Sequence, residues 1–161
     1  MRAIPGADGA GVRTYDTGHP DTIVASAGFV HELDNVQYSL MEGPCVTAAP
    51  QARTVRTGSL GGEPLWPHFG PRAGRLGVHS ALSIQLLPEV SDRVLGAINV
   101  YAHDKDAFDE HAADMAALFA APAAVAVHNA LKQASHHQNI KLNQLAEQIV
   151  HVSVRRARAR H

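Results

Sequence analysis

The sequence predicts an α+β domain with a central, mostly antiparallel β-sheet. Residues 80–87 and 94–101 alternate apolar with small or polar side chains, and the turn residues between them indicate a hairpin. Residues 9–15 and 21–26 form a second pair of strands around a longer loop. A long amphipathic helix is predicted to follow Asp109. The order strand, strand, helices, strand, helix, strand, strand, long helix is that of an α+β domain.

The segment between the two hairpins is predicted to hold short helices and one strand. An amphipathic helix is indicated by a three-four spacing of its positions Phe29, Val30, Leu33, Val36, Gln37 and Leu40. Gly43 and Pro44 end this helix, and Pro44 begins another that runs through Ala49. Residues 54–60 alternate in the manner of a strand with one exposed face. Residues 66–76 are predicted to form a helix that two prolines interrupt.

The long helix near the C-terminus is predicted to begin at Asp109 as its N-cap. One face repeats apolar residues at helical spacing, namely Met115, Leu118, Phe119, Ala123, Ala126, Val127, Ala130 and Leu131. Pro122 lies inside this pattern and predicts a kink. Beyond Ser135 a short heptad-like seam follows, made of Leu142, Leu145, Ile149 and Val152. We expect this seam to contribute to a homodimer contact between helices.

Length and composition fit one globular domain in a reducing compartment. The chain has 161 residues, a net charge of −1 and a single cysteine, so an internal disulfide is excluded. Four arginines crowd the last seven residues, a pattern that fits a solvated terminus or a contact with phosphates. The sequence contains neither an N-terminal apolar run nor a stretch of about 18 apolar residues, so we expect a cytoplasmic protein without a transmembrane helix.

Several short motifs resemble those of the GAF domain family, in the same order and at similar spacing. The matching pieces are Ile4-Pro5-Gly6-Ala7-Asp8-Gly9-Ala10-Gly11-Val12, Leu40-Met41-Glu42-Gly43-Pro44-Cys45, Trp66-Pro67-His68-Phe69, residues 76–83 and Val94-Leu95-Gly96-Ala97-Ile98-Asn99-Val100-Tyr101. More narrowly, the chain resembles actinobacterial GAF domains that precede an RNA-binding ANTAR module. We therefore expect a GAF-type domain over residues 1–135 and a helical extension with a basic tail over residues 136–161. The extension does not resemble an ANTAR module, so binding of nucleic acid is not expected.

The resemblance implies that short helices and loops cover one face of the sheet and that the long C-terminal helix covers the other. It also implies a ligand pocket between the sheet and the short helices, lined by Tyr38, Cys45, Arg56, Trp66, Phe69, Ser80, Asn99 and Tyr101. The aromatic residues would stack on a planar ligand, and Arg56 would bind a carboxylate or a phosphate. The alternative interpretation is that the aromatic residues belong to an ordinary core and that Arg56 is a surface charge.

Cys45 and the histidines are the other candidates for a functional role, as a redox site and as metal ligands. Cys45 follows Pro44 near a predicted helix N-terminus, where the helix dipole favours a thiolate and hence a redox or adduct site. The alternative is a buried core thiol, which the resemblance favours, because GAF proteins that reduce methionine sulfoxide need more than one cysteine. His128, His136 and His137 lack the spacing of a metal site, so neither a metal nor another cofactor is expected.

Together these features predict a non-enzymatic sensory or regulatory domain that binds a small molecule, forms a homodimer, or does both. One alternative is an interaction module that dimerises without any ligand. Another is a redox enzyme that depends on Cys45. The sequence has no Gly-x-Ser-x-Gly motif and no phosphate-binding Gly-x-x-x-x-Gly-Lys-Ser/Thr loop, which argues against two common enzyme classes.

Overall fold

The computed structural model describes residues 4–15, 21–51, 54–87 and 94–133. The strands are β1 (Gly9–Thr14), β2 (Asp21–Ala25), β3 (Val55–Thr57), β4 (Ser80–Leu86) and β5 (Gly96–Ala102). The helices are α1 (Gly28–Leu40), α2 (Pro44–Gln51), the 3-10 turn η1 (Leu60–Gly62), α3 (Phe69–Arg75) and α4 (Glu110–Gln133). The predicted extension over residues 136–161, with the seam Leu142, Leu145, Ile149 and Val152, lies outside the described residues.

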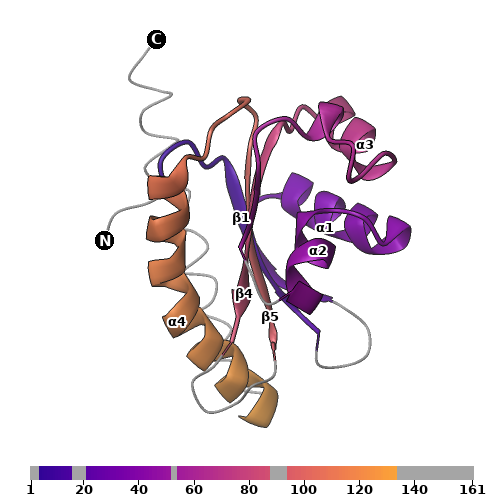
Figure 1. Ribbon diagram of the computed structural model, residues 1–161. Helices are drawn as coiled ribbons and strands as arrows, with labels where there is room; N and C mark the ends of the chain where they lie inside the picture. The colour runs from indigo at the N-terminus through magenta and orange to yellow at the C-terminus, as the bar shows by residue number, and fades with distance from the viewer. Residues whose placement is uncertain (1–3, 16–20, 52–53, 88–93, 134–161) are drawn as a thin grey trace.

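The five strands form one antiparallel sheet in the order β2-β1-β5-β4-β3. Both predicted hairpins are present, because β1 pairs with β2 and β4 pairs with β5. Figure 1 shows the sheet edge-on, with α4 against one face and α1, α2 and α3 against the other. The predicted α+β fold and its three layers are therefore confirmed.

Two predicted elements are shorter than the sequence pattern indicates. The strand expected over residues 54–60 ends at Thr57, because the chain turns into η1, where Glu63 N–H donates to the carbonyl of Leu60. The helix expected over residues 66–76 begins at Phe69, since Pro67 lies in the turn before it. The predicted N-cap of α4 is confirmed: the Asp109 carboxylate accepts from Ala112 N–H at 2.8 Å.

The face of the sheet toward α4 is apolar. The strand register aligns Val12 with Ile98 and Ile98 with Ile84, and these side chains pack with Phe119 and Val127 of α4. Leu118, which was predicted on this packed side of α4, is instead 73% exposed. It follows Ala117 on the outer surface of the helix, about 100° around the axis from Phe119.

α4 is also long and apolar enough to cross a membrane when judged only by length and composition, over Glu110–Asn129. In the structure, 44% of this window is buried inside the domain, on the side of the helix that packs against the core. Ala116, Phe119 and Ala123 are buried against the sheet. Packing of one face on the sheet accounts for the buried part of this apolar composition.

The opposite face of the sheet must allow α1 to approach closely. Gly9 and Gly11 of β1 lie beneath α1, and a Cβ atom at Gly11 would lie 2.8 Å from Val30 Cγ1 and 3.0 Å from the carbonyl oxygen of Val24. Both distances are shorter than a real Cβ atom tolerates comfortably. The two glycines therefore fix how near α1, and every side chain that it carries, comes to the sheet.

We expect Gly11→Ala to lower the free energy of unfolding by about 1–3 kcal/mol, because the added methyl group overpacks the contact between β1 and α1. Chemical denaturation measures this change. Gly61→Ala is the matched control, because a Cβ atom there meets open space. Equal stability of the two variants would contradict this packing argument.

Candidate functional site

The candidate site begins with three buried polar side chains on the sheet face opposite α4. Register pairs Ser83 of β4 with Asn99 of β5, and pairs Ala81 with Tyr101, so these residues share one face. Ser83, Asn99 and Tyr101 have no exposed surface. Ser83 Oγ donates to Asn99 Oδ1 at 2.6 Å. Buried polar side chains need hydrogen-bond partners. Those on β4 and β5 therefore require donors or acceptors from another element of the fold.

Helix α1 provides those partners. Asp34 Oδ1 accepts from Tyr101 OH at 2.6 Å and from Asn99 Nδ2 at 3.0 Å. Gln37, almost one turn further along the helix, donates from Nε2 to Tyr101 OH at 2.6 Å. Asp34 and Gln37 are also fully buried. The carboxylate thus binds two side chains of one strand and ties α1 to the centre of the sheet.

The segment Gly43-Pro44-Cys45 completes this arrangement at the start of α2. Cys45 N–H donates to Gln37 Oε1 at 2.9 Å. Gly43 has φ of 131°, and its missing side chain leaves room for Gln37, whose Oε1 a Cβ atom would strike. Pro44 fills the first position of α2, where no backbone donor is needed. The motif therefore positions the amide and the thiol of Cys45.

Two tyrosines surround the Cys45 sulfur. Tyr15 OH lies 3.1 Å from Sγ and Tyr38 OH lies 3.5 Å from it. The guanidinium of Arg13 lies over the Tyr38 ring, 3.8 Å from its centroid, in cation–π geometry. Arg13 comes from β1, on the same sheet face as Asn99. We call these nine residues the polar cluster: Arg13, Tyr15, Asp34, Gln37, Tyr38, Cys45, Ser83, Asn99 and Tyr101.

Burial keeps the thiol and the phenols of the polar cluster neutral. It raises the pKa of Cys45, and the nearby Asp34 carboxylate raises that pKa further. Burial and Asp34 likewise raise the pKa of Tyr101. Burial, followed by the charge of a Cys45 thiolate, raises the pKa values of Tyr15 and Tyr38. The helix-dipole effect proposed for Cys45 is thus outweighed by desolvation, and the thiol remains protonated.

Glu42, immediately before this motif, connects the site to α3. Its Oε2 accepts from His68 N–H at 2.8 Å and from Phe69 N–H at 2.9 Å, and its Oε1 lies 2.7 Å from His68 Nδ1. The hydrogen bond with the His68 ring is the main cause that lowers the pKa of Glu42. Glu42-Gly43-Pro44-Cys45 therefore links α1, α2 and α3 within four residues.

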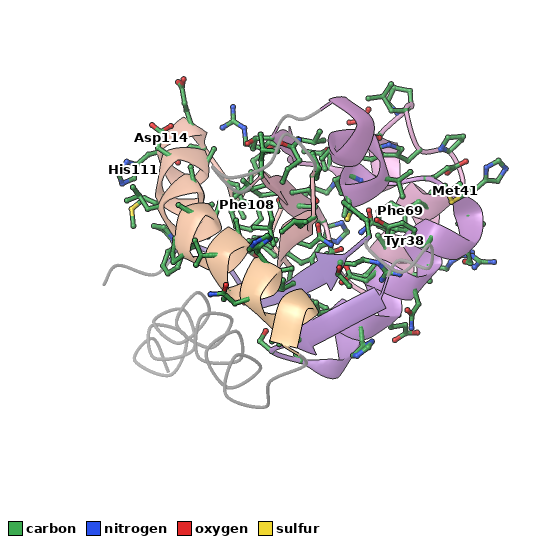
Figure 2. All side chains as sticks on the ribbon, turned by 90° about the horizontal axis from the view of Figure 1, so that it is seen from below. Tyr38, Met41, Phe69, Phe108, His111 and Asp114 are labelled. Carbon is green, nitrogen blue, oxygen red and sulfur yellow. The ribbon has the colours of Figure 1, made fainter. Side chains whose placement is uncertain are left out.

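Of the eight predicted pocket residues, the structure brings four together in the polar cluster, namely Tyr38, Cys45, Asn99 and Tyr101. Trp66 and Phe69 pack in the apolar core around Tyr101, and Trp66 Nε1 donates to Thr47 Oγ1 at 3.0 Å. Figure 2 shows Tyr38 and Phe69 on the side away from α4, and Phe108 on the side of α4. The two aromatic residues thus form an apolar wall beside the cluster.

The remaining two predicted residues lie elsewhere. Arg56 pairs with Leu82, whose side chain faces α4, and Arg56 Nη1 donates to the carbonyl of Phe108 at 3.3 Å. Ser80 Oγ donates to the carbonyl of Asp104 at 2.6 Å. The two-residue period of a strand places both on the face opposite Ser83. The prediction that they line one pocket with Asn99 is therefore wrong.

Sequence reasoning did not select Arg13, Tyr15, Asp34, Gln37 or Ser83 as site residues. A signal for Asp34 was present, because it lies four residues after Val30 and three before Gln37, on the helix face predicted to be buried. A carboxylate at such a position requires hydrogen-bond donors from the core. Among the described residues there is no group of three or more His, Cys, Asp or Glu side chains suited to a metal ion, whereas His136 and His137 lie outside them.

The raised pKa values predict that stability falls as the solution becomes alkaline. Below about pH 7.5 the thiol and the phenols are protonated in both the folded and the unfolded state, so the free energy of unfolding does not change with pH through these groups. Above their unfolded pKa values the unfolded chain releases these protons and the folded chain keeps them, so the free energy of unfolding falls with pH.

Denaturation at a series of pH values between 7 and 11 measures this slope. Tyr38→Phe keeps the ring and removes one ionisable group, so its stability should fall less steeply than that of the wild type. A free energy of unfolding that stays constant up to pH 11 would contradict the burial of these groups as neutral species.

A family model described as GAF domain matches residues 1–128. Among curated proteins, none matches. One similar structure is the type II free methionine-R-sulfoxide reductase from Thermoplasma acidophilum, with a TM-score of 0.62, 18% identity, and coverage of 77% of this chain and 81% of that chain.

Two other similar structures are GAF domains. The GAF domain from a phosphoenolpyruvate-protein phosphotransferase of Coxiella burnetii has a TM-score of 0.61 and 16% identity, and covers 80% of this chain and 76% of that chain. GAF3 of a Synechocystis protein, solved in its photoproduct state, has a TM-score of 0.59 and 13% identity. The match covers 80% of this chain and 86% of that chain. At these identities the structures show a shared fold, and the family model, which spans most of the sequence, shows that the chain belongs to the GAF domain family.

Proposed function

We propose that this GAF domain is a non-enzymatic sensory domain that binds a small polar molecule at the polar cluster. The observation that carries the proposal is the concentration of buried polar groups on one face of a small sheet. Asp34, Gln37, Ser83, Asn99 and Tyr101 are all fully buried and hydrogen-bonded to one another. A core of apolar residues would fold without the desolvation cost of these groups, so their presence favours a binding role.

The chemistry of the cluster indicates the class of ligand. Asp34 accepts hydrogen bonds, Arg13 donates them, and the amides of Gln37 and Asn99 do both. The apolar wall of Trp66 and Phe69 lies on the same side of the sheet. A small molecule with both donor and acceptor groups and one apolar side would match these surfaces.

Binding requires the cluster to open, because its central side chains have no exposed surface. A ligand must replace internal hydrogen bonds such as those from Asn99 and Tyr101 to Asp34. It would therefore favour a state in which α1 and α2 lie differently on the sheet, to the extent that it binds this state more tightly. The link from Cys45 through Glu42 to His68 and Phe69 supports transmission of that change to α3.

A redox enzyme that uses Cys45 is the main alternative, because one similar structure is a methionine sulfoxide reductase. Catalysis by cysteine needs a thiolate that reaches its substrate. The Cys45 thiol is fully buried with a raised pKa, and the chain has no second cysteine to form a disulfide with an oxidised thiol. These features support the binding role over the catalytic one.

A thermal-shift screen of small polar metabolites, including amino acids, carboxylates, nucleobases and nucleotides, tests the proposal. At least one compound should raise the melting temperature of the wild type in a saturable manner, because it stabilises the state that it binds. Ser83→Ala should raise the ligand concentration that gives half of this shift at least tenfold, because the variant loses a hydrogen-bond donor to Asn99.

Ser80→Ala is the matched control. Both serines are fully buried on β4 and both donate a hydrogen bond of 2.6 Å, but Ser80 lies on the opposite face. Its variant should keep the ligand response of the wild type. A response that is lost equally in both variants, or that is unchanged in both, would contradict binding at the polar cluster.

A further inference from the structure

Residues 60–77 leave the sheet between β3 and β4 and fold into one compact unit, which we call the flap. It contains η1 and α3. Its two ends are held together, because Leu60 N–H donates to the carbonyl of His79 at 2.8 Å. Its parts also pack closely on one another, since a Cβ atom at Gly70 would overlap the carbonyl oxygen of Leu60. A segment with adjacent ends and its own packing is able to move as one body.

The inner side of the flap covers one side of the polar cluster. Trp66 and Phe69 are almost fully buried, and they belong to the same apolar core as Leu33 and Tyr101. The hydroxyl group of Tyr101 in turn donates to Asp34. Figure 1 shows α3 next to α1, on the face of the sheet opposite α4. The apolar wall of the proposed site is therefore carried by the flap and not by the sheet.

Glu42, between α1 and α2, holds the outer part of the flap. Its Oε2 accepts from His68 N–H at 2.8 Å and from Phe69 N–H at 2.9 Å, and its Oε1 lies 2.7 Å from His68 Nδ1. Trp66 Nε1 adds a further link from the flap to Thr47 of α2. Hydrogen bonds to a carboxylate are charge-assisted and stronger than those between neutral groups. We call the contacts of Glu42 with His68 and Phe69 the latch.

The latch lies near the surface, unlike the hydrogen bonds around Asp34. The side chain of His68 is 74% exposed and that of Glu42 is 19% exposed. Water can therefore replace the hydrogen bonds of the latch when the two sides separate. Opening the latch consequently costs less free energy than breaking the buried hydrogen bonds of Asp34, and local openings of a folded protein begin at such places.

The structure assigns Glu42 a gating role: its latch keeps the flap closed over the polar cluster, and separation of the latch admits a ligand on the side that Trp66 and Phe69 cover. The inference rests on the proposed function for the purpose of the gate, and adds the route of entry and the residue that controls it. Glu42 acts through the flap, by positioning Trp66 and Phe69.

Thiol reactivity tests the gate without any ligand, so its failure is separate from a failure of ligand binding. Ala73 is fully buried on the inner side of α3. In the variant Ala73→Cys, iodoacetamide reaches the new thiol only when the flap opens, so the rate of modification, followed by mass spectrometry, is proportional to the open fraction. Adding Glu42→Ala should raise this rate about tenfold or more, the factor expected for loss of one charge-assisted hydrogen bond.

Ala116→Cys is the matched control, because Ala116 is equally buried in a helix but packs against the other face of the sheet. Glu42→Ala should leave the rate at that position unchanged. Glu42→Gln keeps an oxygen that can accept from His68 N–H and Phe69 N–H, so its rate at position 73 should lie well below that of Glu42→Ala. An equal rise at both positions would indicate general loosening of the domain and overturn the inference, as would the absence of a rise at position 73.

Hydrogen exchange of the wild-type chain gives a second test that needs none of these variants. The amides of His68 and Phe69, which donate to Glu42, should exchange through a local opening that low concentrations of urea do not accelerate. The central amides of β5 should exchange only through global unfolding, which urea promotes. If the amides of His68 and Phe69 also exchange only through global unfolding, the latch does not open in the folded protein and the proposed gate is wrong.

Discussion

The Asp34 carboxylate is the interaction on which the polar half of this domain depends. It is fully buried, and one of its oxygens accepts hydrogen bonds from both Tyr101 and Asn99. A buried carboxylate without donors is strongly destabilising, so α1 can pack in this position only if β5 provides them. Gly11 allows the helix to come close enough. Gln37 then extends the network from Tyr101 to the amide of Cys45 and so to α2.

The two faces of the sheet consequently have different roles. The face toward α4 is apolar, and its packed side chains provide the hydrophobic stabilisation expected of a small domain. The other face combines the polar cluster with the apolar wall that includes Trp66 and Phe69. Buried polar groups contribute less to stability than apolar groups of the same volume. Proteins typically accept this loss of stability at functional sites. This division between a stabilising face and a polar face supports the proposed sensory role.

Much of the fold was predictable because it depends on local patterns. The two hairpins, the helix after Gly28 and the N-cap Asp109 were all visible as alternation, spacing or capping residues. The site was only half predictable. Motif resemblance selected Tyr38, Cys45, Asn99 and Tyr101, but it also selected Arg56 and Ser80, which strand register places on the other face. Asp34 was missed because its partners are 65 and 67 residues away in the sequence, and no local pattern reports such pairs.

The central claim is that the polarity of the cluster serves a ligand and not the fold. The free energy of unfolding of two variants tests it most directly: the single variant Asp34→Leu, and a quadruple variant that combines it with Arg13→Met, Ser83→Ala and Asn99→Leu. The single variant leaves buried donors unpaired and should lose about 3–5 kcal/mol. The quadruple variant removes Asn99, one of the two donors to Asp34, together with Ser83 and Arg13, leaves only the Tyr101 hydroxyl without this acceptor, and should recover a large part of that loss. If the quadruple variant is as unstable as the single one, the fold itself requires the polar cluster, and the account is wrong.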